Sequence, residues 1–583
     1  MYIEKINSPA DLKNLNAEQR KVLASEIREA LVKKISICGG HSGPNLGMVE
    51  ATIAMHTVFD SPKDKIVFDV SHQSYTHKML TGRKAAFLYE ENYRDVSGYT
   101  NPDESEHDFF NIGHTSTGIS LASGLAKARD LKGEKGNVIA VVGDGSLSGG
   151  EALEGLNFAW EMKSNFIVVV NDNGMSIAEN HGGLYENLKL LRETNGKAEC
   201  NLFKALGLDY VFVRDGNDAE KLIEAFEKVK DSAHPVVVHI CTEKGMGYSF
   251  AQENKEKWHW NGPFDIESGE IKAAMQSQDY PNITAEYLLD KMKKDKTVAV
   301  ITSGTPMVLG FNKERRKQAG SQFIDVGIAE EHAVALASGM AKNGGKPVYG
   351  VQSSFMQRTF DQLSQDLCIN NNSAVMVVNT ASVYAMNDVT HLGIFDIPLI
   401  SNIPNLVYLA PTNKQEYLAM LDWAIEQNSH PVAVRIPCNG VVESDRAVKS
   451  DYSELNKYEV TKKGSKAAVI ALGDFYQLGE ETVKQLEKAG INATLINPVY
   501  ITGIDAKLLD ELKAEHDIVV TLEDGILDGG FGEKIARFYG TDKMRVFNYG
   551  LKKEFIDRYY YREILRENRL TPEQITEDVL KLG

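Results

Sequence analysis

The sequence predicts an α/β protein of three domains built on mostly parallel sheets. At 583 residues the chain is too long for one ordinary domain. Apolar runs of strand length recur along it and alternate with longer segments rich in helix-forming residues. Because strands that alternate with helices favour parallel sheets covered by helices, three series of such runs, beginning near Lys65, Thr297 and Ala467, predict three sheets.

The expected boundaries follow these series. They are a first α/β domain over residues 1–265, a polar linker over 266–290, a second domain over 291–455 and a third over 456–583. Residues 1–35 have helical spacing, and Ser8-Pro9 and Asp11 offer a helix start. The expected strands are Lys65–Ser71, Val138–Gly143, a run ending at Asn171, Tyr210–Val213 and Pro235–Ile240; then a run from Thr297, Phe323–Val326, Pro347–Gln352, Ala374–Asn379, Val407–Ala410 and Val432–Ile436; then a run from Ala467, Ala493–Ile496, Ile518–Leu522 and Met544–Asn548.

Composition excludes several classes of function. With 43% hydrophobic and 25% charged residues the chain reads as a soluble globular protein. A formal charge of −17 argues against a general nucleic-acid binder, because no basic excess exists to neutralise phosphates. The five cysteines are scattered without a CxxC pair, which predicts reduced thiols in a cytoplasmic protein. We expect neither a signal segment nor a membrane span, since no apolar run is long enough.

The strand–helix–strand unit from Val138 to Ser176 carries the strongest chemical signal. Its first apolar run ends in Gly143-Asp144-Gly145 and its second in Asn171-Asp172-Asn173. Because carboxyl ends of parallel strands meet at one edge of a sheet, we expect Asp144 and Asn173 to present oxygen atoms together. Such hard donors suit Mg²⁺ or Ca²⁺, and Mg²⁺ usually accompanies phosphate. The unit is therefore expected to hold a metal–diphosphate group.

Three other polar segments offer contacts to an anionic ligand. They are the glycine-rich loop Cys38–Gly47, the segment around His72 at a strand end, and the Gly113–Gly118 run before an expected helix. Glycines let the backbone approach a ligand closely, and hydroxyl and N–H groups at a helix start bind anions. Each segment also has a plain structural interpretation: a connecting loop, a structural histidine and a simple N-cap.

Seven further segments accompany the GDG and NDN segments in order: GGHSGPNLG, FDVSHQSYTHKMLTGR, ESEHDFFNIGHTSTG, DVGIAEEHAV, SSFMQRTFDQ, THLGIFD and APTNKQE. Over nearly the whole chain, including EDGILDGGFGE near the C-terminus, the sequence resembles the 1-deoxy-D-xylulose-5-phosphate synthase family of the transketolase superfamily. The resemblance implies a transketolase-like fold with a diphosphate- and metal-binding domain, a pyrimidine-binding domain and a C-terminal domain. It also implies a transferase that uses thiamine diphosphate and Mg²⁺.

The same resemblance assigns cofactor contacts residue by residue. Asp144 and Asn173 would bind Mg²⁺ together with the backbone carbonyl of Met175. Phe355 would stack on the pyrimidine ring, with Phe360 as a second candidate. The residues expected around thiamine diphosphate are His72, Gly113, His114, Thr115, Gly145, Ser146, Asn173, Tyr248, Glu330 and Phe355.

Glu330, the first glutamate of IAEEHAV, matches the family carboxylate that hydrogen-bonds the aminopyrimidine. It would hold the imino form, so that the cofactor's own nitrogen takes the thiazolium proton and the ring acts as an electron sink. Such a buried carboxylate is expected to have a shifted pKa, whereas the structural alternative is a glutamate at a helix start. His41, His259 and His391 match histidines that line the pocket and would move protons near neutral pH.

The chain departs from the family pattern at the expected acceptor site. Arg358 matches one phosphate-binding arginine, but Thr380 and Cys438 stand where two others are expected. Gln352 replaces a tyrosine and Asn387 replaces an aspartate, and the insertion after the NDN segment is short. Because arginine clamps phosphate bidentately, these changes remove most of the fixed positive charge. We expect the cofactor chemistry to be kept and the acceptor aldehyde to be altered.

Several functions remain open at this point. A carboligase would decarboxylate pyruvate and add the two-carbon unit to an aldehyde, whereas a transketolase would take that unit from a ketose. A non-catalytic cofactor-binding protein is a third possibility, which Glu330, Asp144 and Asn173 argue against. A NAD-dependent dehydrogenase is disfavoured because no GxGxxG follows an early strand. The resemblance implies a homodimer; the acceptor, the pairing of domains across the dimer and any service to isoprenoid biosynthesis are left open.

Overall fold

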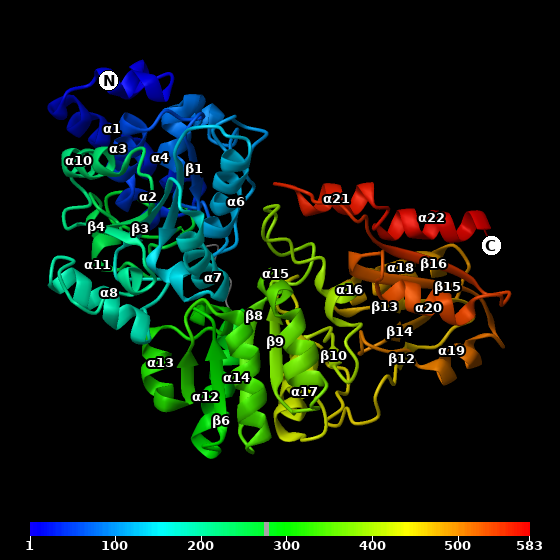
Figure 1. The fold of residues 1–583 in the computed structure, drawn as a ribbon. Helices are drawn as coiled ribbons and strands as arrows, with labels where there is room; N and C mark the ends of the chain where they lie inside the picture. Colours follow the sequence, from blue (N-terminus) through cyan, green and yellow to red (C-terminus); the bar gives the residue numbers. More distant parts are fainter. Residues whose placement is uncertain (273–278, 583) are drawn as a thin grey trace. The chain divides into compact units, whose positions relative to one another are not determined.

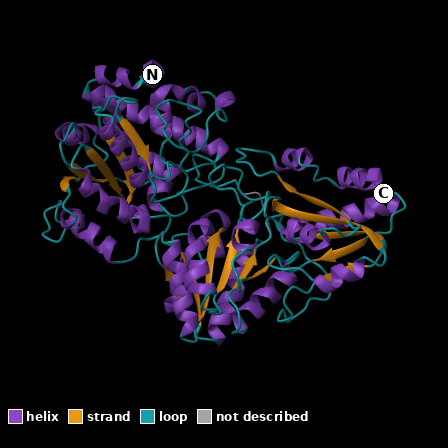
Figure 2. Cartoon of the chain, turned by 45° about the vertical axis from the view of Figure 1, so that its right-hand side comes forward, coloured by secondary structure: helices purple, strands orange, loops and turns teal. Residues whose placement is uncertain are grey.

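The computed structural model describes residues 1–272 and 279–582 of the chain. The chain forms two compact units, of which the first holds residues 1–275 and 327–329 and the second holds 276–326 and 330–583. Figure 2 shows strands flanked by helices throughout, and the prediction of an α/β fold with three mostly parallel sheets is confirmed. Among the described residues, no helix combines the length and apolar character that crossing a membrane requires.

The first unit contains one parallel five-stranded sheet in the order β1-β2-β3-β5-β4 (Figure 1). Val168 and Val170 of the third strand face one apolar core, whereas Ile167 and Val169 face the other. Burial on both faces explains why these strands appear in the sequence as continuous apolar runs. The strands are β1 (Lys65–Phe68), β2 (Val138–Gly143), β3 (Phe166–Asp172), β4 (Asp209–Val213) and β5 (Pro235–Cys241).

Helices contribute apolar side chains to both cores of this unit. The first long helix begins at Ala17, later than expected, because Asn16 caps it by accepting from Gln19 N. Ser8 and Asp11 instead close a capping box on the short 3-10 helix Pro9–Asn14. The helices are α1 (Ala17–Cys38), α2 (Ser42–Gly47), α3 (Val49–Val58), α4 (Tyr75–Lys78), α5 (Ala85–Leu88), α6 (Gly118–Leu131), α7 (Gly150–Ala159), α8 (Gly183–Glu193), α9 (Leu202–Ala205), α10 (Ala219–Val229) and α11 (Ser249–Glu253).

The second unit contains two sheets. One has six parallel strands in the order β10-β11-β9-β8-β6-β7. The other has the order β12-β14-β13-β15-β16, in which only the edge strand β12 pairs antiparallel. The strands are β6 (Val298–Thr302), β7 (Phe323–Asp325), β8 (Lys346–Gln352), β9 (Val375–Asn379), β10 (Val407–Leu409), β11 (Val432–Arg435), β12 (Glu459–Lys462), β13 (Lys466–Ala471), β14 (Thr494–Asn497), β15 (His516–Ile526) and β16 (Arg545–Leu551).

The helices of the second unit include one that begins within the expected linker 266–290, at Tyr280. Residues 273–278 of that range lie outside the described residues. One apolar cluster joins both sheets, since it contains Met376 and Val378 of β9 together with Ala468 and Ile470 of β13. The helices are α12 (Tyr280–Lys294), α13 (Lys313–Ala319), α14 (Glu330–Lys342), α15 (Ser353–Met356), α16 (Asp396–Ile400), α17 (Lys414–Glu426), α18 (Tyr476–Lys488), α19 (Ala506–Leu512), α20 (Phe531–Tyr539), α21 (Tyr561–Glu567) and α22 (Pro572–Leu582).

Candidate active site

The ends of β2 and β3 lie side by side in the first unit, as the sequence predicts. Gly143 pairs with Asn171, so the Asp144 and Asn173 segments leave the sheet at the same edge. A Cβ added at Gly145 would lie only 2.9 Å from Ser176 Oγ, which explains why this close approach needs glycine. Asp144 is 1% exposed and accepts a hydrogen bond of 2.9 Å from Asn180 Nδ2.

The donor set at this edge fits a hard divalent cation. Burial, and then the neighbouring Asp172 carboxylate, raise the pKa of Asp144, so a cation beside it would restore its charge. Asn180 Oδ1 and Ser176 Oγ are buried without a hydrogen-bond partner in the described part of the chain. Asn173 Oδ1 accepts from Met175 N at 3.2 Å within the same loop. Carboxylate and amide oxygens of this kind suit Mg²⁺. Asn180 Oδ1 is a further oxygen atom at this edge, which the sequence analysis does not identify.

A second polar group, Asp172, His239 and Cys241, lies at the neighbouring ends of β3 and β5. The Arg192 guanidinium contacts both Asp172 oxygens at 2.6 Å, and His239 Nε2 lies 2.9 Å from one of them. Burial raises the pKa of Cys241 to about 12, which keeps its thiol protonated. Because these partners already occupy the carboxylate, this group orders the sheet edge and offers no open metal site.

Three predicted histidines come together in the first unit. The ring of His41 lies 4.9 Å from that of His72 and 5.6 Å from that of His259, centroid to centroid, and the last two are 5.3 Å apart. Asn45, which is fully buried, holds two of them: its Nδ2 donates to the carbonyls of His41 and His72 at 2.7 Å each. Its Oδ1 accepts from Tyr75 N at 2.9 Å. Asn45 is therefore a positioning residue that the sequence pattern alone did not reveal.

Lys244 connects the cluster of His41, His72 and His259 to the sheet edge that carries Asp144 and Asn173, here called the metal edge. Its Nζ lies 3.1 Å from His259 Nδ1 and donates to the Ser176 carbonyl at 2.7 Å. Burial lowers the pKa of Lys244 to about 7, and the Asp144 carboxylate opposes that shift. Burial, and then the nearby Lys244, also lower the pKa of His259. A lysine three residues after the end of a buried strand, in the KGMGY segment, is the signal that could identify this residue.

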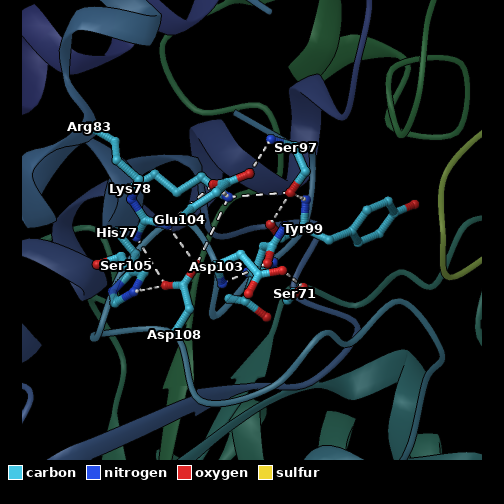
Figure 3. A network of polar contacts seen from close by, with 12 residues as sticks. Ser71, His77, Lys78, Arg83, Ser97, Tyr99, Asp103, Glu104, Ser105 and Asp108 are labelled. Carbon is cyan, nitrogen blue, oxygen red and sulfur yellow. Dashed lines mark hydrogen bonds and ion pairs between the residues drawn. The ribbon is translucent and has the colours of Figure 1, made fainter. Parts of the chain in front are cut away.

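A buried ionic network joins His77, Lys78 and Arg83, which follow His72 in the chain, to Glu104 and Asp108 (Figure 3). Arg83 donates to both oxygens of Asp108 at 2.6 and 3.0 Å, and His77 Nε2 lies 2.9 Å from Asp108 Oδ1. Lys78 is fully buried and pairs with Glu104. The charged residues that follow His72 in the chain are therefore paired with one another inside the protein.

The end of β1 differs from its prediction. The strand stops at Phe68, because Val70 and Ser71 take positive φ angles of 58° and 64°. Such angles are unfavourable for a β-branched valine and occur where surrounding contacts enforce them. Ser71 Oγ donates to the Ile112 carbonyl at 2.6 Å and accepts from Thr100 N at 2.8 Å. These contacts fix a sharp turn immediately before His72.

The expected anion site at the start of α6 is corrected in part. Asp69 accepts from the N–H groups of Ser116 and Gly118 at 3.0 and 2.8 Å, so a carboxylate of the chain itself already caps this helix. His114 and Thr115 are half-buried in the preceding loop, after the buried Gly113, and Ser146 is buried beside Gly145.

Tyr248 lies in an aromatic cluster with Trp258 and Phe264, at ring distances of 5.1 and 5.7 Å. Its hydroxyl donates to the Ile266 carbonyl at 3.0 Å. The Tyr248 hydroxyl is therefore hydrogen-bonded to the backbone of the chain itself.

Glu330 begins α14 in the second unit and is 2% exposed. Burial raises its pKa, while the Arg358 guanidinium, whose Nη1 donates to Glu330 Oε2 at 3.4 Å, opposes the rise. The carboxylate lies at the N-terminus of α14 but is buried, so it is not the surface glutamate of the structural alternative; its role at the aminopyrimidine stays a prediction. Arg358 is predicted to bind a substrate phosphate, but its guanidinium also contacts the Glu330 carboxylate.

Phe355 and His391 meet in the same unit, with ring centroids 5.5 Å apart in a T-shaped arrangement. His391 is 7% exposed, and its Nδ1 lies 2.8 Å from Thr390 Oγ1 and 3.6 Å from Asp388 Oδ1. Gln352 ends β8 opposite Asn379, the residue before Thr380. Phe360, the alternative stacking residue, is 43% exposed, so the contacts favour Phe355.

Each of the remaining acceptor candidates forms a hydrogen bond to another residue of the chain. Thr380 has a φ of 53°, and its hydroxyl donates to the Asn379 carbonyl at 2.7 Å. Asn387 Nδ2 donates to the Tyr559 carbonyl at 3.1 Å. Cys438 is held through its backbone N–H by Asp474 Oδ2 at 2.9 Å.

The nearest guanidinium in sequence to Cys438 is Arg435, which is 3% exposed. It donates to Asp396 Oδ2 at 2.8 Å and to Asp524 Oδ1 at 2.6 Å. Two buried carboxyl groups of the chain itself therefore occupy this guanidinium, which is buried and makes its ion pairs inside the protein.

Comparison with known proteins matches each part of the chain to a family. A family described as 1-deoxy-D-xylulose-5-phosphate synthase matches residues 3–201 and 190–242, the transketolase pyrimidine binding domain matches 276–441, and the transketolase C-terminal domain matches 456–575. A 1-deoxy-D-xylulose-5-phosphate synthase of Clostridium beijerinckii is 38% identical over 100% of this chain and 99% of its own length. That of Carboxydothermus hydrogenoformans is 38% identical over 98% of each. The chain belongs to the 1-deoxy-D-xylulose-5-phosphate synthase family.

Membership of this family confirms the prediction of a transferase-type enzyme. It also confirms the expected cofactors, thiamine diphosphate and a divalent metal ion such as Mg²⁺, and the expectation of small-molecule substrates. The assignment of individual residues to these groups is a separate question.

Proposed function

We propose that this enzyme, which like its family decarboxylates pyruvate and joins the two-carbon unit to an aldehyde, takes an acceptor that need not carry a phosphate. The observation that carries the proposal is the state of the acceptor-side cations. Arg435 is neutralised by Asp396 and Asp524, and Arg358 contacts Glu330. Fixed arginine forks are the side chains that hold phosphate esters bidentately, and at positions 380 and 438 this chain has threonine and cysteine.

The residues of the first unit would hold the cofactor's charged end. Asp144, Asn173 and the carbonyl of Met175 would bind Mg²⁺, with Asn180 as a further oxygen donor. Gly145, Ser146, His72, Gly113, His114 and Thr115 would surround the diphosphate, with Tyr248 completing the site. When bound, thiamine diphosphate supplies the electron sink that makes decarboxylation and carbon–carbon bond formation possible.

The chain's own groups would manage protons and orientation. Glu330 would accept a hydrogen bond at the aminopyrimidine from its buried position, while Phe355 stacks on the ring. His41, His259 and His391 would hold or transfer protons at the donor and acceptor carbonyl oxygens, a task for which neutral imidazole suits near pH 7. Gln352, Thr380, Asn387, Cys438 and Arg358 would contact the acceptor.

The direct test is steady-state assay of the purified holoenzyme with pyruvate and a panel of aldehydes, following both carbon dioxide and the ketose. We expect turnover that requires Mg²⁺ and thiamine diphosphate, with a KM for D-glyceraldehyde no higher than that for glyceraldehyde 3-phosphate. Efficient turnover with tight saturation by glyceraldehyde 3-phosphate alone would contradict the altered acceptor. Omission of Mg²⁺ should abolish product, which tests the metal edge in the same experiment.

The alternative function is transfer of a ketol unit from a sugar, which the family matches support less well than the reaction with pyruvate. The two reactions differ in release of carbon dioxide. No decarboxylation of pyruvate with any aldehyde, together with turnover of a ketose donor, would decide for the transfer reaction.

Our proposals on organisation are three domains over residues 1–265, 291–455 and 456–583 joined by the linker 266–290, a homodimer, and a cytoplasmic location. The presence of three sheets supports the first, family membership the second, and five unpaired cysteines the third. Light scattering of the purified enzyme tests the dimer, which predicts twice the chain mass of 64.5 kDa.

A further inference from the structure

The second unit contains a cavity of about 420 Å³ that none of the site residues lines. One wall is the connection Ser401–Val407, which runs from the end of α16 to β10. The other wall is formed by α20 and the segment around Tyr500 and Thr502. A volume of this size accommodates a small organic molecule.

The electrostatic character of this cavity is unusual for the chain. The protein carries 81 acidic and 64 basic side chains, yet no aspartate or glutamate is among the described residues that line the cavity. The ionisable side chains that do line it are Lys534, Arg537 and His430. Three basic groups without an acid in the lining favour an anionic ligand.

Lys534 and Arg537 are presented by the same face of α20, three residues apart. Lys534 Nζ donates to Ser401 Oγ at 2.8 Å and to the Ile501 carbonyl at 3.0 Å, and both acceptors are neutral. In the part of the chain that the structure describes, neither Lys534 nor Arg537 forms an ion pair. No ion pair therefore occupies either cation, and burial removes part of the charge of Lys534 near pH 8.

The remainder of the lining indicates what the anion is attached to. The apolar surface of the lining comes chiefly from Leu455, which is 37% exposed, while Leu406 and Tyr500 are buried behind it and the Tyr500 hydroxyl is bonded to the Tyr452 carbonyl at 2.8 Å. Asn402 and Asn456 add neutral polar groups at the rim. A ligand with a charged end and an apolar or aromatic body matches this division.

We propose that this cavity is a binding site for a small phosphate monoester with an apolar body, held by Lys534, Arg537 and His430. A dianionic phosphate forms hydrogen-bonded ion pairs with ammonium and guanidinium groups, in which both partners are charged, and a neutral or cationic ligand cannot do so. The site is separate from the proposed acceptor residues, and the proposal does not depend on which aldehyde the enzyme uses.

The ammonium of Lys534 provides an independent readout. Burial lowers the pKa of Lys534 to about 8; the Glu523 carboxylate opposes this shift and Arg537 adds to it. A bound dianion favours the charged form, so binding at pH 8 should be accompanied by proton uptake. Calorimetry in buffers of different ionisation enthalpy measures that proton directly.

The test is isothermal titration of the holoenzyme, saturated with thiamine diphosphate and Mg²⁺ so that the cofactor's diphosphate site is filled. The probe is phenyl phosphate, with orthophosphate as the second ligand. Phenyl phosphate should bind saturably and at least about threefold more tightly than orthophosphate because of the apolar wall. Equal affinity for the two ligands would overturn the monoester assignment, and no saturable binding of either would overturn the site.

Matched variants locate the binding. R537Q, at an exposed position, should weaken phenyl phosphate binding about tenfold, and K534M should weaken it more and remove the proton uptake at pH 8. K543M removes one exposed cation from the same unit outside the cavity and should leave binding unchanged. Thermal unfolding controls for damage to K534M, while R537Q keeps the test independent of it. Binding that R537Q leaves unchanged would contradict the proposal.

Discussion

Charged groups are paired differently at the metal edge of the first unit and in the loops of the second unit around Thr380 and Cys438, here called the acceptor loops. At the metal edge Asp144 is buried without a fixed cation on its oxygens, and Asn180 and Ser176 keep buried polar atoms unpartnered among the described residues. At the acceptor loops Arg435 is fully matched by Asp396 and Asp524. The first region therefore has buried polar atoms that a ligand could contact, whereas the second has paired its guanidinium with carboxyl groups of the chain itself.

This difference separates two kinds of requirement. A cofactor that is shared by a whole family needs the same donors in every member, so the strand ends around Asp144 and Asn173 follow the family pattern. Recognition of the acceptor depends on side chains that can change without loss of that chemistry. If positions 380 and 438 are the phosphate-binding positions that the sequence analysis predicts, the structure adds that Arg435 does not replace them, because it pairs with Asp396 and Asp524.

The largest expected effect tests the cofactor side. Replacing Glu330 by alanine removes the only described carboxylate that resemblance places at the aminopyrimidine, and kcat should fall about 10³-fold. Carbon dioxide release from pyruvate measures it. The neighbouring variant Glu331→Ala is the matched control and should retain most activity. A Glu330→Ala enzyme with unchanged kcat would break the comparison, because the cofactor side would then be as altered as the acceptor side.

The next effect concerns the acid that holds the Cys438 loop. Asp474 is 8% exposed, and burial, and then the Asp524 carboxylate, raise its pKa to about 7. Between its ordinary pKa of 3.8 and about 7, the folded chain keeps a proton that the unfolded chain has released. Stability should therefore fall as pH rises through this window, by up to about 4 kcal/mol in total.

Asp474→Asn should remove the part of this pH dependence that Asp474 contributes, while Asp144 and Glu523, whose pKa burial also raises, keep theirs. The variant should be the more stable form at pH 8, because its amide oxygen can still accept from Cys438 N. Urea unfolding at pH 5, 6, 7 and 8 measures the slope. Asp445→Asn, at an exposed position, is the control and should follow the wild type. Parallel pH profiles of Asp474→Asn and wild type would show that this carboxyl is ionised in the folded chain.

The particular residues show what sequence could and could not predict. Strands such as β3 and β9 were predicted because burial on both faces requires continuous apolar runs. The shared sheet edge of Asp144 and Asn173 follows from a parallel strand–helix–strand connection, and the pairing of Gly143 with Asn171 confirms it. Lys78 with Glu104 and Arg83 with Asp108 could not be predicted, since nothing local specifies which of many charged residues will pair after folding.

Two further misses have a different cause. The turn at Val70 and Ser71 was read as strand because valine favours extended backbone, and only tertiary contacts enforce its positive φ. The helix start at Gly118 was read as an open anion site because its cap, Asp69, lies 49 residues earlier in the chain. Long-range capping of this kind leaves no local signature.

A smaller effect tests the support of the histidine cluster. Asn45→Ala would leave Tyr75 N–H buried without its partner and release the carbonyls of His41 and His72. We expect a loss of about 2 kcal/mol in unfolding free energy and about tenfold in kcat/KM for pyruvate, because the rings lose their fixed separation. Asn254→Ala, at an exposed position, is the control and should change neither quantity. Loss of stability without loss of kcat/KM would limit Asn45 to a structural role.

The smallest effect sharpens the comparison most, because it attempts to reverse the acceptor-side change. Cys438→Arg restores a guanidinium beside a loop that Asp474 already anchors through the backbone. Part of the new charge will be drawn to Asp474, so we expect the KM for glyceraldehyde 3-phosphate to fall only about fivefold, with the KM for D-glyceraldehyde unchanged. Cys438→Gln provides similar length without charge and should change neither value. An equal fall for both aldehydes would mean that position 438 acts on the carbonyl end of the acceptor and not on its phosphate. No change for either would place the phosphate elsewhere, with Arg358 the next residue to test.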